Sequence, residues 1–172
     1  TAGPTYEHLD PVRYIGNHSS GKMGFAIAKA ALAKGYLVEL ISGPTSEELI
    51  HPNLTRCDVV SANEMMLQVK EKWGLCKFGV FTAAVSDYTP IKTSEVKIKK
   101  SESELNLGFT KNPDILKWAS FNRTTEQKVI GFALETNNEE ENALIKLDAK
   151  KLDLLVLNST RDEKATFGGD LN

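Results

Sequence analysis

The stretch MGFAIAKAALAKGYLVELIS, residues 23–42, decides the fold class because it joins a helix pattern directly to a strand pattern. Phe25, Ala28, Ala31 and Leu32 recur at helical spacing, which predicts a helix with one apolar face. Gly35 stands where a glycine commonly ends such a helix. The run LVELIS that follows predicts a buried strand. Units of this kind build α/β proteins with a parallel sheet.

The same alternation continues along the rest of the chain. Further strands are predicted in residues 55–61, 78–85, 128–136 and 152–158, and further helices in residues 61–73, 112–120 and 137–151. Ser61 is the predicted N-cap of the second helix, with Glu64 at capping-box distance, and Asn112 is the predicted cap of the third, with Pro113 in its first turn. We therefore expect an α/β fold with a Rossmann-like, mostly parallel sheet and helices on both faces. Ligands bind such sheets at the carboxyl ends of the strands.

Residues 86–110 are more polar than the strand that precedes them. They are polar, and Val96 and Ile98 alternate with lysines before the chain turns through Ser-Glu-Ser. This pattern predicts a hairpin flap that projects from the domain.

Composition limits the classes of function. The 172 residues suit one domain, and a net charge of -2 gives no electrostatic footprint for nucleic acid. No apolar run is long enough to cross a membrane and no signal peptide is present, which predicts a cytoplasmic protein. Cys57 and Cys76 are predicted to be buried free thiols, and the scattered histidines argue against a zinc site.

Because the chain begins at TAGPT without a preceding strand and stops at FGGDLN, we expect a fragment of residues 1–172 that lacks the first strand and the C-terminal end.

The stretch GNHSSGKM, residues 16–23, falls one residue short of a phosphate-binding P-loop. Met23 replaces the Ser or Thr whose hydroxyl would bind magnesium, and Pro11 and Arg13 interrupt the strand that should precede the loop. Ser19 or Ser20 could still cap a helix that begins near Gly21, with N–H groups free for an anion. A phosphate site of another kind and an ordinary capped helix are equally good interpretations.

Four groups of polar or small residues fall in predicted loops at one edge of the sheet. They are Arg13 and Asn17 with residues 19–24; Ala83, Ala84 and Asp87; Lys97, Lys99 and Lys100; and the NPDIL segment with Phe132, Lys146 and Lys150. Each has a structural alternative: lysines on an exposed edge, a simple helix start, a core phenylalanine, or a turn-capping aspartate. Their convergence favours a site for a nucleotide and a second anionic substrate.

The motifs TAGPT, LDPVRYIGNHSSGKMGFAIA, TAAVSDY, VKIKK, KNPDIL and GFALET together resemble the phosphopantothenoylcysteine synthetase family of coenzyme A biosynthesis. The resemblance runs along the whole chain, and the NHSSGKMG motif is similar to the bacterial form. It implies a ligase that joins 4'-phosphopantothenate to L-cysteine with CTP, through an acyl-cytidylate, giving CMP and pyrophosphate. Magnesium is the implied cofactor, with ligands that the sequence does not identify. A homodimer is implied as well, together with fusion to a flavin-dependent decarboxylase domain that would carry FMN and is absent from this chain.

The resemblance also implies roles for individual residues. Lys97 and Asn17 would be catalytic, with Lys97 on the flap and Asn17 beside the acyl-cytidylate; Arg13, Asn17 and the backbone of Ala84 would hold phosphopantothenate. The nucleotide would contact Ser19, Ser20, Gly21, Ala83, Asp87, Lys97, Pro113, Asp114, Ile115, Leu116, Phe132, Lys146 and Lys150, although either ligand could touch the 19–24 loop. Gly16 departs from the serine expected of the family.

Three alternatives stay open. The same ligase could use ATP, because an aspartate that faces an exocyclic amine does not exclude adenine. A dinucleotide-dependent oxidoreductase would need a GxGxxG loop, of which only Gly21 and Gly24 are present. A non-catalytic binding module would need neither the Lys97 flap nor two adjacent ligand sites.

Overall fold

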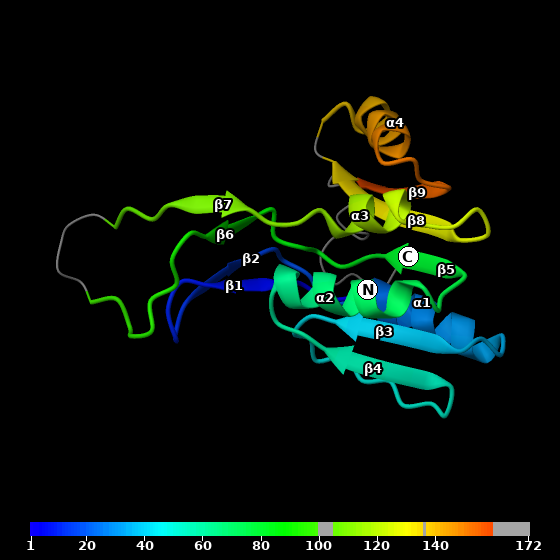
Figure 1. The fold of residues 1–172 in the computed structure, drawn as a ribbon, viewed down its shortest axis with the longest axis horizontal. Helices are drawn as coiled ribbons and strands as arrows, with labels where there is room; N and C mark the ends of the chain where they lie inside the picture. The colour runs from blue at the N-terminus through cyan, green and yellow to red at the C-terminus, as the bar shows by residue number, and fades with distance from the viewer. Residues whose placement is uncertain (100–104, 136, 160–172) are drawn as a thin grey trace.

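The computed structural model describes residues 1–99, 105–135 and 137–159 (Figure 1). The strands are β1 (Tyr6–His8), β2 (Tyr14–Gly16), β3 (Val38–Ser42), β4 (Leu54–Asp58), β5 (Phe78–Phe81), β6 (Tyr88–Pro90), β7 (Phe109–Lys111), β8 (Lys128–Glu135) and β9 (Leu154–Ser159). The helices are α1 (Lys22–Ala33), α2 (Ala62–Trp73), α3 (Ile115–Phe121) and α4 (Glu139–Ala149). The predicted alternation of strands and helices is therefore confirmed.

Residues 1–5 occupy the middle of the sheet. On one side the Ala2 N–H donates to the Ile41 carbonyl at 2.9 Å, and on the other the Ala84 N–H donates to the Gly3 carbonyl at 2.9 Å. The segment runs parallel to both neighbours, through the bridges Ala2–Ser42 and Pro4–Ala84. The strand pairs β3–β4, β5–β8 and β8–β9 are parallel as well. The resulting order is β4, β3, residues 1–5, β5, β8, β9. This is the doubly wound order, whose ligand crevice lies where the strand order reverses, between residues 1–5 and β5.

Helices cover both faces of this sheet, as predicted. Figure 1 shows α2 and α3 in front of the strands and α1 behind them. The larger buried cluster packs α2 and α3 against the sheet, with Met65 and Val129 completely buried at its centre. A smaller cluster packs Phe25 and Ala28 of α1 against Ala2 and Leu40.

Two short antiparallel pairs project from the sheet as an arm, which consists of residues 6–16, 88–99 and 105–111 (Figure 1). The rings of Tyr6 and Tyr14 stack at 3.9 Å in the hairpin formed by β1 and β2. A buried carboxylate ties this hairpin to the domain, since Oε1 of Glu7 accepts from the Ala62 N–H at the start of α2 at 2.9 Å. The predicted flap is confirmed as the pair β6 and β7, but residues 91–99 form no strand, and Lys100 lies outside the described residues.

The helix ends test the capping predictions. Ser61 and Glu64 form the predicted capping box of α2, and Gly35 follows α1 in a left-handed conformation at φ 83°. Neither Ser19 nor Ser20 is the N-cap of α1: that position belongs to Gly21, at φ 81° with no side-chain cap. This correction follows from the backbone, because a left-handed residue at the cap favours glycine.

The prediction that Asn112 caps the third helix is also wrong. Asp114 is the N-cap of α3, and its carboxylate accepts from the Lys117 N–H at 2.9 Å. Asn112 is held by the segment after β5 instead, because its N–H donates to the Asp87 carbonyl and its Nδ2 to the Ser86 carbonyl, both at 2.9 Å.

The two cysteines are free thiols, as predicted, but both are only half-buried. Burial raises the pKa of the Cys76 thiol. None of the helices in the described part of the chain combines the length and the apolar character needed to span a membrane.

Candidate functional site

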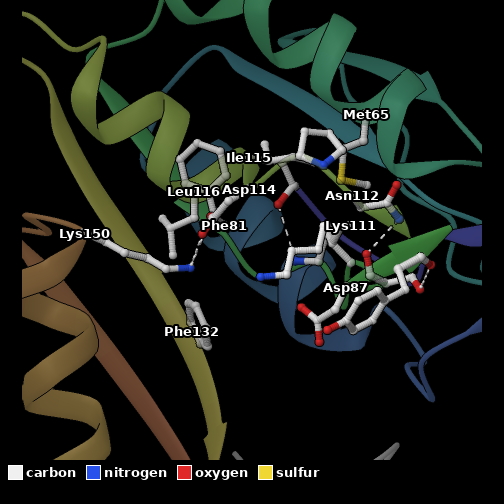
Figure 2. Close-up of a pocket in the computed structure, with 16 residues that line it drawn as sticks. Met65, Phe81, Asp87, Lys111, Asn112, Asp114, Ile115, Leu116, Phe132 and Lys150 are labelled. Atoms are coloured by element: carbon white, nitrogen blue, oxygen red, sulfur yellow. Dashed lines mark hydrogen bonds and ion pairs between the residues drawn. The ribbon is translucent and has the colours of Figure 1, made fainter. Parts of the chain in front are cut away.

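A pocket of about 520 Å³ lies beyond the carboxyl end of β5 (Figure 2). Its lining comes from the central segment, from α2, from β5 and the residues after it, from the end of β7 and the start of α3, from β8, and from the residue after α4: Thr1, Met65, Phe81, Ala83, Val85, Ser86, Asp87, Tyr88, Lys111, Asn112, Pro113, Asp114, Ile115, Leu116, Phe132 and Lys150. Eight residues predicted to contact a nucleotide thus meet in one cavity: Ala83, Asp87, Pro113, Asp114, Ile115, Leu116, Phe132 and Lys150.

Asp87 and Phe132 approach the pocket from different sides. Asp87 is exposed on the segment after β5, and its backbone carbonyl accepts from the Asn112 N–H at 2.9 Å. Phe132 is a half-buried residue of β8. Figure 2 shows both side chains directed toward the space between them. An acceptor on one side and an apolar ring on the other suit a flat heterocycle that carries an amine.

The cationic groups of the pocket are Lys111 and Lys150. The Nζ of Lys150 lies 3.1 Å from Oδ1 and 2.9 Å from Oδ2 of Asp114 (Figure 2). The Asp114 carboxylate also caps α3 by accepting from the Lys117 N–H, so it places a negative charge beside Lys150 in this part of the pocket.

Lys146 is not brought to the pocket with Lys150. Its ammonium forms an ion pair with the carboxylate of Glu135 and lies outside the lining. Both lysines, Lys146 and Lys150, are thus paired with carboxylates, of Glu135 and Asp114 respectively.

Arg13 lies within the arm, where it holds a buried carboxylate. Its Nε and Nη2 donate to Oδ2 of Asp10 at 2.9 and 2.5 Å, and Nη2 also donates to the Ile98 carbonyl at 2.8 Å. The Asp10 side chain is completely buried. The guanidinium beside it holds the pKa of the Asp10 carboxyl well below its usual range.

Asn17 links the arm to the pocket. Its Nδ2 donates at 2.9 Å to the carbonyl of Val85, a lining residue. The backbone of Ala84, predicted to hold phosphopantothenate, is paired with the central segment: its N–H donates to the Gly3 carbonyl at 2.9 Å and its carbonyl accepts from the Thr5 N–H at 3.3 Å. Gly16 precedes Asn17, and a Cβ at this position would lie 2.7 Å from the Thr5 carbonyl oxygen, which explains the absence of a serine there.

The loop of Ser19, Ser20 and Gly21 lies beside the central segment of the sheet. Its hydroxyls are used locally, since Ser19 Oγ accepts from the Gly21 N–H at 3.3 Å and Ser20 Oγ from the Lys22 N–H at 3.4 Å. The hydroxyl of Thr45 donates to the Ser20 carbonyl at 2.6 Å and fixes the loop. These three residues do not line the pocket.

Lys97 is an exposed residue of the arm and is likewise absent from the lining. Arg13, Asn17, Ala84, Lys97 and the 19–21 loop therefore form a second group of predicted residues. Two members of this group adjoin the pocket: Asn17 through its hydrogen bond to Val85, and Ala84 through its place between the lining residues Ala83 and Val85.

Sequence reasoning missed Lys111 as a pocket residue. The antiparallel register pairs Lys111 with Tyr88, next to Asp87, and no local pattern reveals this pairing. The Nδ2 of Asn112 donates to the Ser86 carbonyl at 2.9 Å, while its Oδ1 is buried with no hydrogen-bond partner. Among the described residues, no group of three or more His, Cys, Asp or Glu could hold a metal ion.

Comparison with known proteins gives a family match over the full chain. Residues 1–172 match the family described as the DNA/pantothenate metabolism flavoprotein C-terminal domain. The coenzyme A biosynthesis bifunctional protein CoaBC of Escherichia coli K12 is 45% identical over 175 residues, covering 100% of this chain and 43% of that protein. A cysteine/cysteine sulfinic acid decarboxylase from an unknown prokaryotic organism is 42% identical over 99% of this chain and 48% of its own length.

The chain thus spans about half, or less, of the curated relatives that it matches. Among solved structures, the crystal structure of the C-terminal domain of a CoaBC protein superposes with a TM-score of 0.79 at 39% identity, covering 91% of this chain and 74% of that one.

Proposed function

Because the chain belongs to the family of DNA/pantothenate metabolism flavoprotein C-terminal domains, we propose that it is a ligase that joins 4'-phosphopantothenate to L-cysteine with CTP. The relative from Escherichia coli is named for coenzyme A biosynthesis, which supports this choice of pathway. The strongest structural support is the pocket, in which Asp87 and Phe132 face a space of about 520 Å³ beside Lys111 and Lys150.

The proposed reaction has two steps. A carboxylate oxygen of phosphopantothenate attacks the α-phosphorus of CTP; the bond to the bridging oxygen breaks, and pyrophosphate leaves. The amine of cysteine then attacks the acyl carbon of the acyl-cytidylate, loses a proton, and expels CMP as the amide forms. Such transfers depend mainly on alignment of the two anions and neutralisation of their charge.

In this proposal the pocket binds the nucleotide. Asp87 accepts hydrogen bonds from the exocyclic amine of the base, and Phe132 packs against the ring. Lys111 and Lys150 provide positive charge for the phosphates. The described residues offer no cluster of protein ligands for a metal, so Mg²⁺ would be bound chiefly by the triphosphate oxygens.

The second anion would bind between the pocket and the arm. Asn17 supports this placement, because its amide is held on Val85 at the pocket wall. Lys97 would neutralise charge in the transition state, and its exposure leaves the ammonium available to a ligand. We expect Lys97→Gln to lower turnover strongly and to leave the free energy of unfolding nearly unchanged, since an exposed lysine contributes little to stability. Parallel losses of turnover and stability would contradict this role.

ATP is the nearest alternative nucleotide, because adenine also carries an exocyclic amine that Asp87 could bind. An oxidoreductase shares the strand order found here, but its fingerprint is lacking. The first turn contains no GxGxxG, and β3 ends at Ser42, followed by Gly43, without an acidic residue to bind a ribose.

We also propose a homodimer that forms through the arm. Val12, Ile91 and Val96 expose 62%, 63% and 72% of their surface there, and apolar side chains gathered on a projecting segment are typical of contact surfaces. A fused decarboxylase domain is a further proposal, supported by the greater length of the relatives.

The test is pyrophosphate release by the purified chain with Mg²⁺ and 4'-phosphopantothenate, comparing CTP with ATP, with and without cysteine. The proposal predicts release with CTP in preference to ATP, and formation of CMP once cysteine is added. Preference for ATP would transfer the proposal to the adenylate route. Failure to bind or cleave either nucleotide would refute the ligase assignment.

A further inference from the structure

The Asp10 carboxylate is the centre of a hydrogen-bond network between two parts of the arm. Oδ1 accepts from the backbone N–H groups of Val12 and Arg13 at 2.8 and 2.9 Å. Oδ2 accepts from the guanidinium of Arg13 and, at 3.1 Å, from the N–H of Ile98. The side chain has no exposed surface. One carboxylate thus joins the loop before β2 to a segment more than eighty residues later in the chain.

Arg13 completes the connection from the other side. Its Nη2 donates to the Ile98 carbonyl at 2.8 Å, so both backbone polar groups of Ile98 are bound by the Asp10–Arg13 pair. Two further bonds run alongside, from the Ser94 N–H to the Leu9 carbonyl at 2.9 Å and from the Thr93 hydroxyl to the His8 carbonyl at 3.0 Å. Residues 93–98 are therefore held along the loop, and Lys97 immediately precedes the fixed residue.

We propose that Asp10 is a positioning residue for the ligase reaction, which acts through Arg13 and the backbone of Ile98 to hold Lys97 where it serves the reacting phosphate. This inference rests on the proposed function and extends it to a residue that contacts neither substrate. It also assigns Arg13 a structural role, because its guanidinium already donates hydrogen bonds to the Asp10 carboxylate and to the Ile98 carbonyl.

The charge of Asp10 is essential to this arrangement. An ionised carboxylate can accept from several donors at once, and a charged acceptor forms stronger hydrogen bonds than a neutral amide. Asp10→Asn removes the negative charge that pairs with the Arg13 guanidinium. It also replaces one carboxylate oxygen, an acceptor, by an amide NH₂ group, a donor that would face the backbone N–H groups. A displacement of about 1 Å at a catalytic group can cost about 100-fold in rate.

The test combines Asp10→Asn with Lys97→Gln in a double-mutant cycle, measured as kcat for pyrophosphate release with CTP. Asp10→Asn alone is expected to lower kcat about 10- to 100-fold. In the Lys97→Gln background the same change should cost less than about twofold, because the residue through which Asp10 acts is already gone. Asp58→Asn is the matched control, since it neutralises an aspartate that is 68% exposed and paired with Arg56; it should leave kcat unchanged in both backgrounds.

Amide hydrogen exchange of residues 93–98 gives a readout that does not depend on activity. Asp10→Asn should remove protection at Ser94 and Ile98, whereas Asp58→Asn should not. If Asp10→Asn does not fold, Asp10→Glu takes its place; it keeps the charge but moves the oxygens by one methylene, so a smaller loss with the same dependence on Lys97 is expected.

Multiplicative losses in the double variant, or unchanged protection at Ile98, would overturn the inference. A wild-type chain without pyrophosphate release would instead refute the proposed function, and the exchange measurement would still decide whether Asp10 fixes residues 93–98.

Discussion

Gly24→Ala tests the close approach between α1 and the centre of the sheet. A Cβ at this position would lie 2.5 Å from the Cβ of Ala2, 2.6 Å from Oγ1 of Thr82 and 3.0 Å from the Cα of Ala2. Neither neighbour can move aside easily. Ala2 is bonded into the sheet, and the Thr82 hydroxyl donates to the Thr1 carbonyl at 2.8 Å. The helix must therefore shift, or the hydroxyl must give up its hydrogen bond.

Two opposing effects determine the size of the change. Overpacking of this kind costs about 1–3 kcal/mol, and loss of the Thr82 hydrogen bond would add about 1 kcal/mol. Alanine in place of glycine within a helix returns about 1 kcal/mol. The free energy of unfolding should fall by about 1–3 kcal/mol, which corresponds to a decrease in Tm of about 2–12 °C for a chain of this size.

The assay is thermal and urea-induced unfolding followed by circular dichroism, with Gly74→Ala as the matched control. Gly74 has φ -62°, and a Cβ there meets nothing within 4 Å. This variant should be neutral or up to about 1 kcal/mol more stable than the wild type. The steric reasoning would be refuted if Gly24→Ala were as stable as Gly74→Ala.

Three further predictions concern the site and the arm. Asp87→Asn should raise KM for the nucleotide about tenfold with little effect on Tm, because loss of one charge-assisted hydrogen bond to a ligand costs roughly 1.5 kcal/mol of binding free energy. An unchanged KM in steady-state kinetics would show that Asp87 does not bind the base. Lys150→Ala should raise the same KM at least about fivefold and Lys146→Ala should change it less, since only Lys150 lines the pocket; the opposite order would contradict the pocket assignment. Because Arg13 lowers the pKa of the Asp10 carboxyl, the contribution of Asp10 to the free energy of unfolding is complete above about pH 4 and is lost as the pH falls toward the pKa of the folded state. Unfolding curves should therefore show that the wild type is more stable than Asp10→Asn by a constant amount from pH 7 to about 5. This difference in the free energy of unfolding should shrink below about pH 4.

Patterns that depend on neighbouring residues were predictable from the sequence. The capping box of α2 and the glycine after α1 require only residues within one turn, and both were predicted correctly. The N-caps of α1 and α3 were not, because several candidates lie next to each other. Backbone conformation selected Gly21 over Ser19 and Ser20. At α3 the cap is Asp114, and the side chain of Asn112 binds the Ser86 carbonyl instead.

Contacts made by distant backbone groups were not predictable. The acidic and basic residues of LDPVR gave no sign that their shared partner is the backbone of Ile98. Similarly, Lys111 reaches the pocket through its pairing with Tyr88, across a connection of more than twenty residues. Backbone groups carry no residue identity, so a sequence pattern cannot show which of them a side chain will bind.

The pairing of residues 1–5 on both sides has a consequence for the order of folding. This segment hydrogen-bonds to Ile41 and Gly43 on one side and to Val80, Thr82 and Ala84 on the other. A ribosome that has released the chain only as far as residue 70 has supplied one of these two partners. The central segment then carries an unpaired edge of the kind that promotes association between chains, and β5 must emerge before that edge is covered. Translation speed between β4 and β5 should therefore influence how much of the nascent chain aggregates.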